Sequence, residues 1–336
     1  MRVRFHDDAD EDGRVIDPAA RTSISAGAPA CGRFAPSPTG PLHVGNLRTA
    51  LLSWLVARSS GGQWLVRMED LDRVTSSVEH EADQLLSLEL LGLVSDHEVV
   101  RQSQRFERYA AAITDLTAVG RVYPCYCTRS EIRMAAHAPH GAAPDGAYPG
   151  TCRRLTASEL TTFEREGRRP ALRLRADSAT LDAAELTVHD LVAGTYVGRA
   201  DDVVLQRNDG VPAYNLAVVV DDAAQGITQV VRGDDLLEST PSHMLLQRLL
   251  HLPTPQYAHV PLVLAPDASR LAKRHGAVTL ADLAARGVSA AQVLARLGAS
   301  LGLCHEREVV TAESMLAGFE LSAIGREPWT LTASEL

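Results

Sequence analysis

Lysine is almost absent from this chain. Arginine fills 32 of the 33 basic positions among 336 residues, and the single lysine is Lys273, in the stretch SRLAKRHGAV (269–278). A surface charge would not require lysine here. A compact ammonium on a flexible stem suits a phosphate, whereas the planar guanidinium of arginine binds differently. Lys273 is therefore either a phosphate-binding residue or a lysine present by chance.

The sequence also lacks long apolar runs and an excess of positive charge. No apolar stretch approaches the roughly 20 residues of a membrane-spanning helix. Residues 1–30 are polar and acidic, without the apolar core of a signal peptide, and we interpret them as a disordered leader. A formal net charge of −9 argues against a protein that coats nucleic acid without sequence preference, but it does not exclude a local basic surface. We expect a cytoplasmic monomer.

Cysteine is scarce, and its number is odd. The five cysteines are Cys31, Cys125, Cys127, Cys152 and Cys304. An odd number with three clustered favours a metal site in a reducing compartment over a disulfide framework, and a small core cluster is the alternative. Three thiolates leave a tetrahedral zinc one ligand short. The local candidates are His137, His140 and Tyr148, and chemistry alone favours histidine, the commoner ligand.

Apolar runs alternate with helical patterns along most of the chain. Residues 31–37 and 63–70 are typical of strands, and residues 43–60 and 76–93 are typical of helices. The first helix should present Leu47, Leu51 and Leu55 on one face and end at the two glycines 61–62. This order predicts an α/β fold with a parallel sheet.

Two segments depart from this alternation. Residues 120–200 hold the cysteine cluster and an arginine-rich stretch, which we interpret as an inserted subdomain, whereas patterns after residue 279 are helical only. Asp235 is expected to cap the helix that follows it. The predicted divisions are a leader (1–30), the first half of the main domain (31–119), the insertion (120–200), the second half (201–278) and a helical C-terminal segment (279–336).

The stretch RFAPSPTGPLHVGN (33–46) joins a strand end, a proline-stiffened turn and the start of a helix. Gly40 and Gly45 let another group approach the backbone. The N–H groups and dipole of a helix beginning near His43 suit a phosphate, and His43 would add a donor. The stretch is neither a Walker loop nor a Rossmann glycine pattern. A stiff turn with a surface histidine is the alternative.

The string PSPTGPLHVGN resembles the HIGH signature of class I aminoacyl-tRNA synthetases in its glutamate-type form, and RLAKRHG, about 230 residues later, resembles the partner KMSKS loop. The resemblance continues through LVRMEDLDRVTSS, QSQRFERY and VVRGDDLLESTPSHMLLQRLL, over most of residues 31–280. It implies an α/β catalytic domain of Rossmann type with a parallel sheet and an inserted zinc-containing subdomain.

The same resemblance implies an ATP site at these two strings, with Mg²⁺ accompanying the nucleotide. Lys273 stands where the family's second KMSKS lysine contacts the phosphates as charge develops. Ala272 stands where the family has serine, so one hydroxyl donor to the phosphates is missing. The implied catalytic residues are His43 and Lys273, and the implied ATP-binding residues are His43, Gly45, Asn46, Arg270 and Lys273.

Glutamate needs cations for its carboxylates and an anion for its ammonium. By resemblance, Arg33 and Arg232 bind the carboxylates with Tyr214 as a hydroxyl partner, and Glu69 recognises the α-ammonium. Without the family, the charges around Glu69 would be interpreted as a salt-bridged strand end. The implied glutamate-binding residues are Arg33, Phe34, Ala35, Pro36, Ser37, Glu69, Tyr214 and Arg232.

The cysteine cluster resembles that of one group in the family, the glutamyl-queuosine tRNA(Asp) synthetases, which carry a C-x-C…Y-x-x-x-C zinc site. The implied ligands of one structural Zn²⁺ are Cys125, Cys127, Tyr148 and Cys152, with His140 as the alternative fourth ligand. The sequence continues for 63 residues after Lys273 (336 − 273), so we expect no helical anticodon-binding domain like that of full-length glutamyl-tRNA synthetases.

These features imply activation of glutamate by ATP and transfer of glutamate to the queuosine base in the anticodon loop of tRNA(Asp). The alternatives are a truncated glutamyl-tRNA synthetase charging a tRNA 3′ end, a ligase acting on a small amine, and a catalytically weak RNA-binding paralogue, which Ala272 would support. The arginines at 153–154 and 165–175 are candidate RNA contacts or simply solvated charges.

Overall fold

The computed structural model describes residues 30–128, 130–132, 148–176, 185–269, 271 and 279–331. The expected leader lies outside the described residues except for Ala30. Five other residues named above also lie outside them: His137, His140, Arg270, Ala272 and Lys273.

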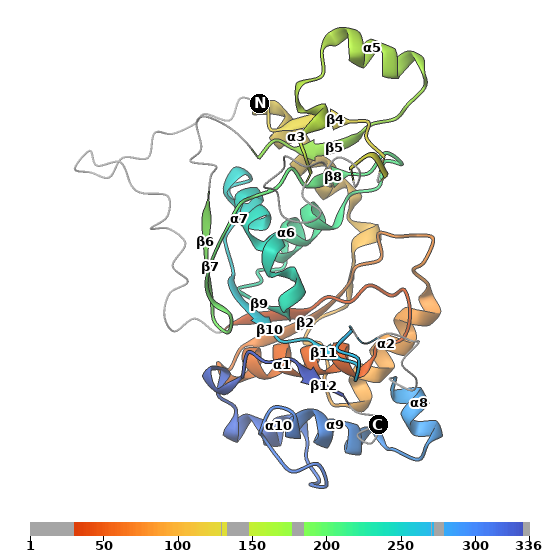
Figure 1. The fold of residues 1–336 in the computed structure, drawn as a ribbon. Helices are drawn as coiled ribbons and strands as arrows, with labels where there is room; N and C mark the ends of the chain where they lie inside the picture. The colour runs from red at the N-terminus through yellow and green to blue at the C-terminus, as the bar shows by residue number, and fades with distance from the viewer. Residues whose placement is uncertain are drawn as a thin grey trace, which may run out of the picture.

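A seven-stranded sheet in the order β3-β2-β1-β9-β10-β6-β7 forms the centre of the protein (Figure 1). Its strands pair in parallel except for the antiparallel hairpin β6–β7, so the predicted parallel α/β sheet is confirmed. Strand β1 pairs with β2 on one side and β9 on the other, and such switch points bind ligands at the carboxyl ends of the strands. The strands are β1 (Cys31–Phe34), β2 (Gln63–Met68), β3 (Val100–Arg101), β6 (Leu186–Asp190), β7 (Gly194–Gly198), β9 (Gln229–Gly233) and β10 (Gln256–Val260).

Helix α1 (Val44–Ser59) is buried on nearly all sides. The predicted face of Leu47, Leu51 and Leu55 has no exposed area, and α1 packs against β1 and β9. Its other side meets the C-terminal helices α9 (Ala290–Ala299) and α10 (Ala312–Met315) (Figure 1). A helix enclosed in this way needs apolar residues around its whole circumference, which explains the apolar character of this segment.

The C-terminal segment is not purely helical, contrary to the prediction. Besides α8 (Leu280–Ala285), α9 and α10 it contains two 3₁₀ turns and a short strand, β12 (Trp329–Thr330). Strand β12 pairs in parallel with β11 (Val263–Leu264), which leads out of the main sheet region. This pairing ties the end of the described chain to the segment that precedes the Lys273 string.

A second sheet, the antiparallel β4-β5-β8, lies at the end of the molecule opposite α9 and α10 (Figure 1). Side chains of β5 and β8 form a second core with three helices that join the two ends. The predicted boundary at residue 200 is wrong, because β6 and β7 belong to the main sheet while the later β8 belongs to the small one. The elements are β4 (Val122–Cys125), β5 (Ala171–Leu174), β8 (Val204–Gln206), α3 (Phe106–Ala118), α5 (Ala157–Arg165), α6 (Tyr214–Ala224) and α7 (Thr240–Leu249).

Helix ends follow local signals in most places. Helix α2 (Val78–Leu90) starts at its cap Ser77 and is followed by Gly92 with a φ of +75°, as the glycine there predicts. The predicted cap at Asp235 is wrong, because residues 234–239 form a 3₁₀ turn and α7 begins at Thr240 with a proline in its first turn. None of the helices in the described ranges is long and apolar enough to cross a membrane.

Candidate active site and metal centre

The turn after β1 places His43 at the start of α1. Its Nδ1 accepts a hydrogen bond from the backbone N–H of Asn46 at 3.2 Å, and Asn46 Oδ1 accepts one from the backbone N–H of His43 at 3.2 Å. Burial lowers the pKa of His43 and favours the neutral ring. Because Nδ1 accepts, the neutral ring carries its proton on Nε2. The site therefore offers an imidazole N–H donor beside the N–H groups of a helix start.

Gly45 keeps the space beside this ring open. A Cβ at this position would lie 3.1 Å from both Nδ1 and Cε1 of His43 and 3.3 Å from the Cβ of Val263. The backbone of His43 also forms a bridge with that of Thr279, the first described residue after 272–278. Thr279, which follows the second predicted string, is thus paired with the histidine of the first, although Lys273 itself lies outside the described residues.

Two buried arginines share a pair of carboxylates at the ends of β1 and β2. Asp222 Oδ1 lies 3.2 Å from Arg33 Nε and 2.8 Å from Arg67 NH1, and Glu69 Oε1 lies 3.4 Å from Arg67 NH2. Burial alone would raise the pKa of Asp222, but Arg33 and Arg67 hold it below its usual range. The charges of these four side chains balance one another.

Arg232, on β9, has neutral neighbours instead. Its Nε donates to His259 Nε2 at 3.0 Å, its NH1 lies 3.2 Å from His243 Nδ1, and its NH2 donates to Thr240 Oγ1 at 2.9 Å. Arg232 is 5% exposed, and no carboxylate of the described residues lies within 4.0 Å of its guanidinium. Its positive charge is therefore not compensated by an ion pair in this part of the chain.

The structure brings together most of the predicted glutamate-binding residues. Tyr214 starts α6, its ring stands edge-on to His243 with centroids 5.9 Å apart, and its hydroxyl feels the charges of Arg33, Glu69 and Arg232. Burial raises the pKa of Tyr214. The four residues after Arg33 form the strand end and turn beside this group. Of these, Phe34 and Pro36 are buried, Ala35 is half-buried and Ser37 is exposed.

Sequence reasoning missed the acidic partner of this site. Asp222 follows Asp221 at the end of the apolar run in YNLAVVVDD, and both side chains are buried. A carboxylate on a buried helix must find a hydrogen-bonded cation, so this pair of acids within an apolar run was the available signal. His243 and His259 were also missed, and no local pattern marks them.

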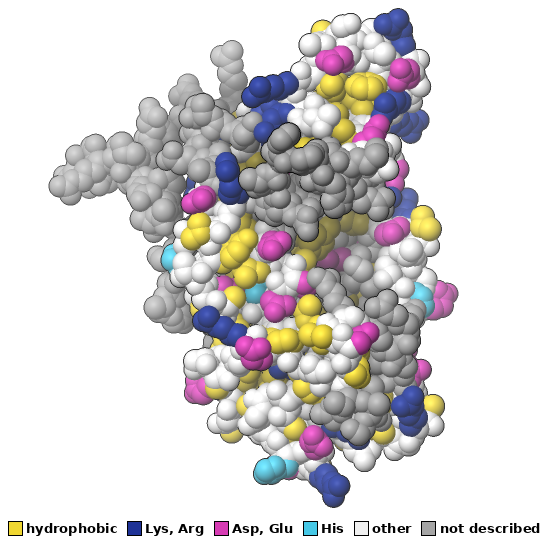
Figure 2. All heavy atoms as spheres, in the orientation of Figure 1, with side chains coloured by type: hydrophobic (Ala, Val, Ile, Leu, Met, Phe, Trp, Pro, Cys, Tyr) yellow, Lys and Arg dark blue, Asp and Glu magenta, His cyan; other side chains and the backbone are white. Residues whose placement is uncertain are grey.

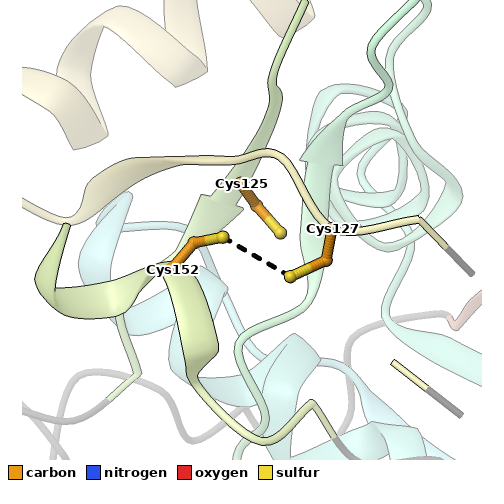
Figure 3. Close-up of side chains that lie close together, drawn as sticks. All are labelled: Cys125, Cys127 and Cys152. Carbon is orange, nitrogen blue, oxygen red and sulfur yellow. Dashed lines mark hydrogen bonds between the residues drawn. The ribbon is translucent and has the colours of Figure 1, made fainter. Parts of the chain in front are cut away.

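Three thiols gather between β4 and the turn at residues 151–154 (Figure 3). The sulfurs of Cys125, Cys127 and Cys152 lie within 4.8 Å of one another, with 3.4 Å between Cys127 and Cys152. Tetrahedral zinc with bonds of about 2.3 Å separates two sulfurs by about 3.8 Å, whereas a disulfide needs about 2.05 Å. The three thiols could therefore hold one metal ion.

Tyr148 closes this group. Its hydroxyl lies 3.3 Å from Cys125 Sγ and 3.6 Å from Cys127 Sγ, and accepts a hydrogen bond from the backbone N–H of Cys152 at 2.9 Å. An oxygen and a sulfur on one tetrahedral zinc lie about 3.5 Å apart. The guanidinium of Arg173 stacks 3.9 Å from the centroid of the Tyr148 ring. Among the described residues, the phenol oxygen is thus spaced as a fourth ligand would be.

Comparisons with known proteins agree with this geometry. Residues 31–336 match the family of class I tRNA synthetases (E and Q), catalytic domain. The chain is 56% identical to a glutamyl-Q tRNA(Asp) synthetase of Nocardia farcinica, over 91% of this chain and 94% of that protein, and 47% identical to one of Symbiobacterium thermophilum, over 91% and 97%.

A solved structure gives the same result. The crystal structure of a glutamate tRNA ligase from Elizabethkingia meningosepticum in complex with its amino acid superposes with a TM-score of 0.77 at 26% identity, covering 91% of this chain and 68% of that one. The chain therefore belongs to the class I tRNA synthetases of the glutamyl and glutaminyl type, a family of ligases.

Proposed function

We propose that this protein activates glutamate with ATP and transfers the glutamyl group to the queuosine base of tRNA(Asp). The observation that carries the proposal is the buried charge of Arg232, which has no carboxylate partner among the described residues. Burying a cation without an anionic partner costs several kcal/mol of desolvation free energy. A dicarboxylic amino acid supplies that anion, and the glutamyl-Q relatives are named for this reaction.

Glutamate has three charges, and each finds a partner in this proposal. Arg232 and Arg33 bind the carboxylates, the Tyr214 hydroxyl adds a hydrogen bond, and Glu69 accepts from the α-ammonium. Glu69 can do so because its link to Arg67 is a single contact of 3.4 Å, which leaves oxygen lone pairs available. The turn of residues 34–37 lines the remaining side.

ATP would lie with its phosphates at the start of α1. The Nε2–H of His43 and the backbone N–H of Gly45 would donate to phosphate oxygens, and Asn46 would hold the His43 ring in place through their reciprocal hydrogen bonds. Arg270 and Lys273 would approach from the second string, and Thr279, which follows that string, pairs with His43. A glutamate carboxylate oxygen then attacks the α-phosphorus and pyrophosphate leaves. These donors stabilise the developing charge, so no side-chain nucleophile is required.

The second step is acyl transfer. A hydroxyl of the queuosine cyclopentene-diol attacks the acyl carbon of the glutamyl-adenylate, and AMP leaves with the electron pair of the broken C–O bond. Mg²⁺ accompanies ATP in the first step. The residues of this chain contribute mainly by holding the reacting groups in position and by stabilising charge.

Zinc in this proposal is structural. Cys125, Cys127, Tyr148 and Cys152 make a closed set of four ligands, which fits the spacing of their sulfur and oxygen atoms. A four-coordinate site with no open position contributes folding energy rather than chemistry. It would fix the turn at residues 151–154 against β4.

The RNA-binding surface is proposed at the end formed by the small sheet and α5. Figure 2 shows several basic side chains there, with acidic side chains among them. Arg153 is engaged by Asp202, and Arg173 stacks on Tyr148. The exposed arginines remaining for RNA are Arg154, Arg165 and Arg169. The cytoplasmic location and the monomeric state stay predictions.

Glutamate-dependent ATP–pyrophosphate exchange, with and without tRNA, tests the proposal. Exchange without tRNA, followed by labelling of tRNA(Asp) only when it carries queuosine, is the expected result. Exchange that requires tRNA(Glu) would indicate a truncated charging enzyme. Absence of glutamate-dependent exchange under both conditions would refute the catalytic proposal and favour the weak paralogue.

A further inference from the structure

Two chains of hydrogen bonds converge on Arg232 from residues that have no role in the proposed reaction. In the first, Asp190 Oδ2 lies 2.6 Å from His259 Nδ1, and His259 Nε2 accepts from Arg232 Nε. In the second, Asn215 Oδ1 lies 2.8 Å from His243 Nε2, and His243 Nδ1 lies 3.2 Å from Arg232 NH1. The five residues come from β6, β10, β9, α6 and α7.

Asp190 fixes the tautomer of His259. The Oδ1 atom of Asp190 accepts from the backbone N–H groups of Val192, Ala193 and His259 at 2.7–3.0 Å, which holds the carboxylate in place. A carboxylate only accepts, so His259 Nδ1 carries the proton and Nε2 must accept from Arg232. Burial lowers the pKa of His259, and the charge of Arg232 lowers this pKa further. The hydrogen bond to Asp190 raises the pKa but does not outweigh these two effects, so the ring is neutral.

Arg232 fixes the tautomer of His243 from the other side. A guanidinium only donates, so His243 Nδ1 accepts and Nε2 carries the proton, which then points at the carbonyl oxygen of Asn215. His243 is 1% exposed, and burial followed by the charge of Arg232 holds its pKa well below the usual value. With Thr240 and the backbone carbonyl of Leu236, four neutral acceptors therefore face Arg232.

Neutral acceptors, like carboxylates, can orient a guanidinium through hydrogen bonds, but only carboxylates offset its charge. Arg33 and Arg67 share Asp222, whose carboxylate compensates part of their combined charge. Arg232 donates to imidazoles, a hydroxyl and a backbone carbonyl, so no carboxylate of the described residues contacts it, and Asp222 feels its charge only over a longer distance. The nearest carboxylate of the first chain, Asp190, is separated from Arg232 by a whole imidazole ring.

We propose that Asp190, His259, His243 and Asn215 are positioning residues that orient Arg232 without neutralising it, and that they set the preference of this enzyme for an amino acid with an anionic side chain. The inference rests on the proposed function, since it assigns glutamate as the anion. A neutral amide such as glutamine would leave the buried charge of Arg232 unpaired, and sites of this kind reject the mismatched ligand strongly.

The first test is Asp190→Asn. The new amide can still accept backbone N–H groups, but it presents N–H to His259 Nδ1 and moves the imidazole proton to Nε2, opposite Arg232 Nε–H. We expect the glutamate KM in pyrophosphate exchange to rise about tenfold or more while the ATP KM is unchanged, because a wrong tautomer misplaces the group that it holds. A purely structural role would lower kcat through loss of active protein and leave both KM values in place.

The second test is Asn215→Asp, which keeps the shape and the tautomer of His243 but adds a negative charge one imidazole away from Arg232. We expect the ratio of kcat/KM for glutamate over glutamine to fall in both variants. This variant keeps the inference testable if Asp190→Asn does not fold.

The outcomes separate the two proposals. Glutamate KM values and glutamate-over-glutamine ratios equal to wild type in both variants would overturn the inference and leave the proposed function intact. No glutamate-dependent exchange by the wild-type protein would overturn both proposals, because Arg232 would then have no glutamate to receive.

Discussion

Asp222 offers the most direct test of how the charges in the active site are balanced. Its carboxylate bonds to Arg33 and Arg67, and together with Glu69 the four side chains are formally neutral. Asp222→Asn leaves one excess positive charge in a buried position, and breaking such a pair costs about 3–5 kcal/mol of unfolding free energy. We expect both arginines then to turn toward Glu69, which would weaken its proposed contact with the α-ammonium. We therefore expect the glutamate KM to rise about tenfold, equivalent to about 1.4 kcal/mol.

The preceding residue supplies a matched control. Asp221 is also fully buried, but it accepts from Gln102, Arg105 and Tyr109 and not from the arginines beside the proposed glutamate site, and its charge reaches Arg67 only over a longer distance. Asp221→Asn should lose a similar unfolding free energy in urea and keep the wild-type glutamate KM among the molecules that remain folded. Pyrophosphate exchange as a function of glutamate concentration measures the difference. An unchanged KM in Asp222→Asn, or an equal rise in both variants, would refute the reasoning.

Further predictions concern the metal centre, the helix cap and pH. Metal analysis should find one zinc per chain. The Cys152→Ser variant should lose this zinc and have a lower Tm, whereas the Cys304→Ser variant, changed outside the three clustered cysteines, should retain the zinc. His43→Ala should cost about 1 kcal/mol of stability through the lost cap and slow pyrophosphate exchange by about 10²-fold; exchange at the wild-type rate would contradict the proposed donor role. The pKa values of His43, His243 and His259 are lowered by burial, so below about pH 6.5 the unfolded chain binds more protons than the folded protein. The free energy of unfolding should therefore fall from about pH 6.5 toward pH 5, by about 1.4 kcal/mol per unit of pKa shift for each histidine, and a flat profile in urea titrations would contradict this.

Local sequence patterns predicted the helices and strands better than they predicted which residues contact one another across the fold. The limits of α1 follow from apolar periodicity and the glycines after it, and both signals are read within a few residues. The partner of Arg33 is Asp222, 189 positions away, and no local rule selects it. The predicted domain boundary at residue 200 was wrong for a similar reason. Local patterns can indicate that strands lie within residues 186–206, but they do not show which of the two sheets each strand joins. The grouping of Cys125, Cys127 and Cys152 could be predicted because their spacing in the sequence is typical of cysteines that share a metal ion.

The metal centre and the strand that carries Asp190 are linked by the path of the chain. The backbone leaves the main sheet after β3, returns at β6, leaves again after β7 and returns at β9. The small sheet β4-β5-β8 therefore cannot be deleted or replaced as one continuous segment, because that segment would include β6 and β7, which belong to the main sheet. Asp190, the last residue of β6, lies 2.6 Å from His259 Nδ1, so the residue proposed to orient His259 belongs to a strand that such a replacement would also disturb.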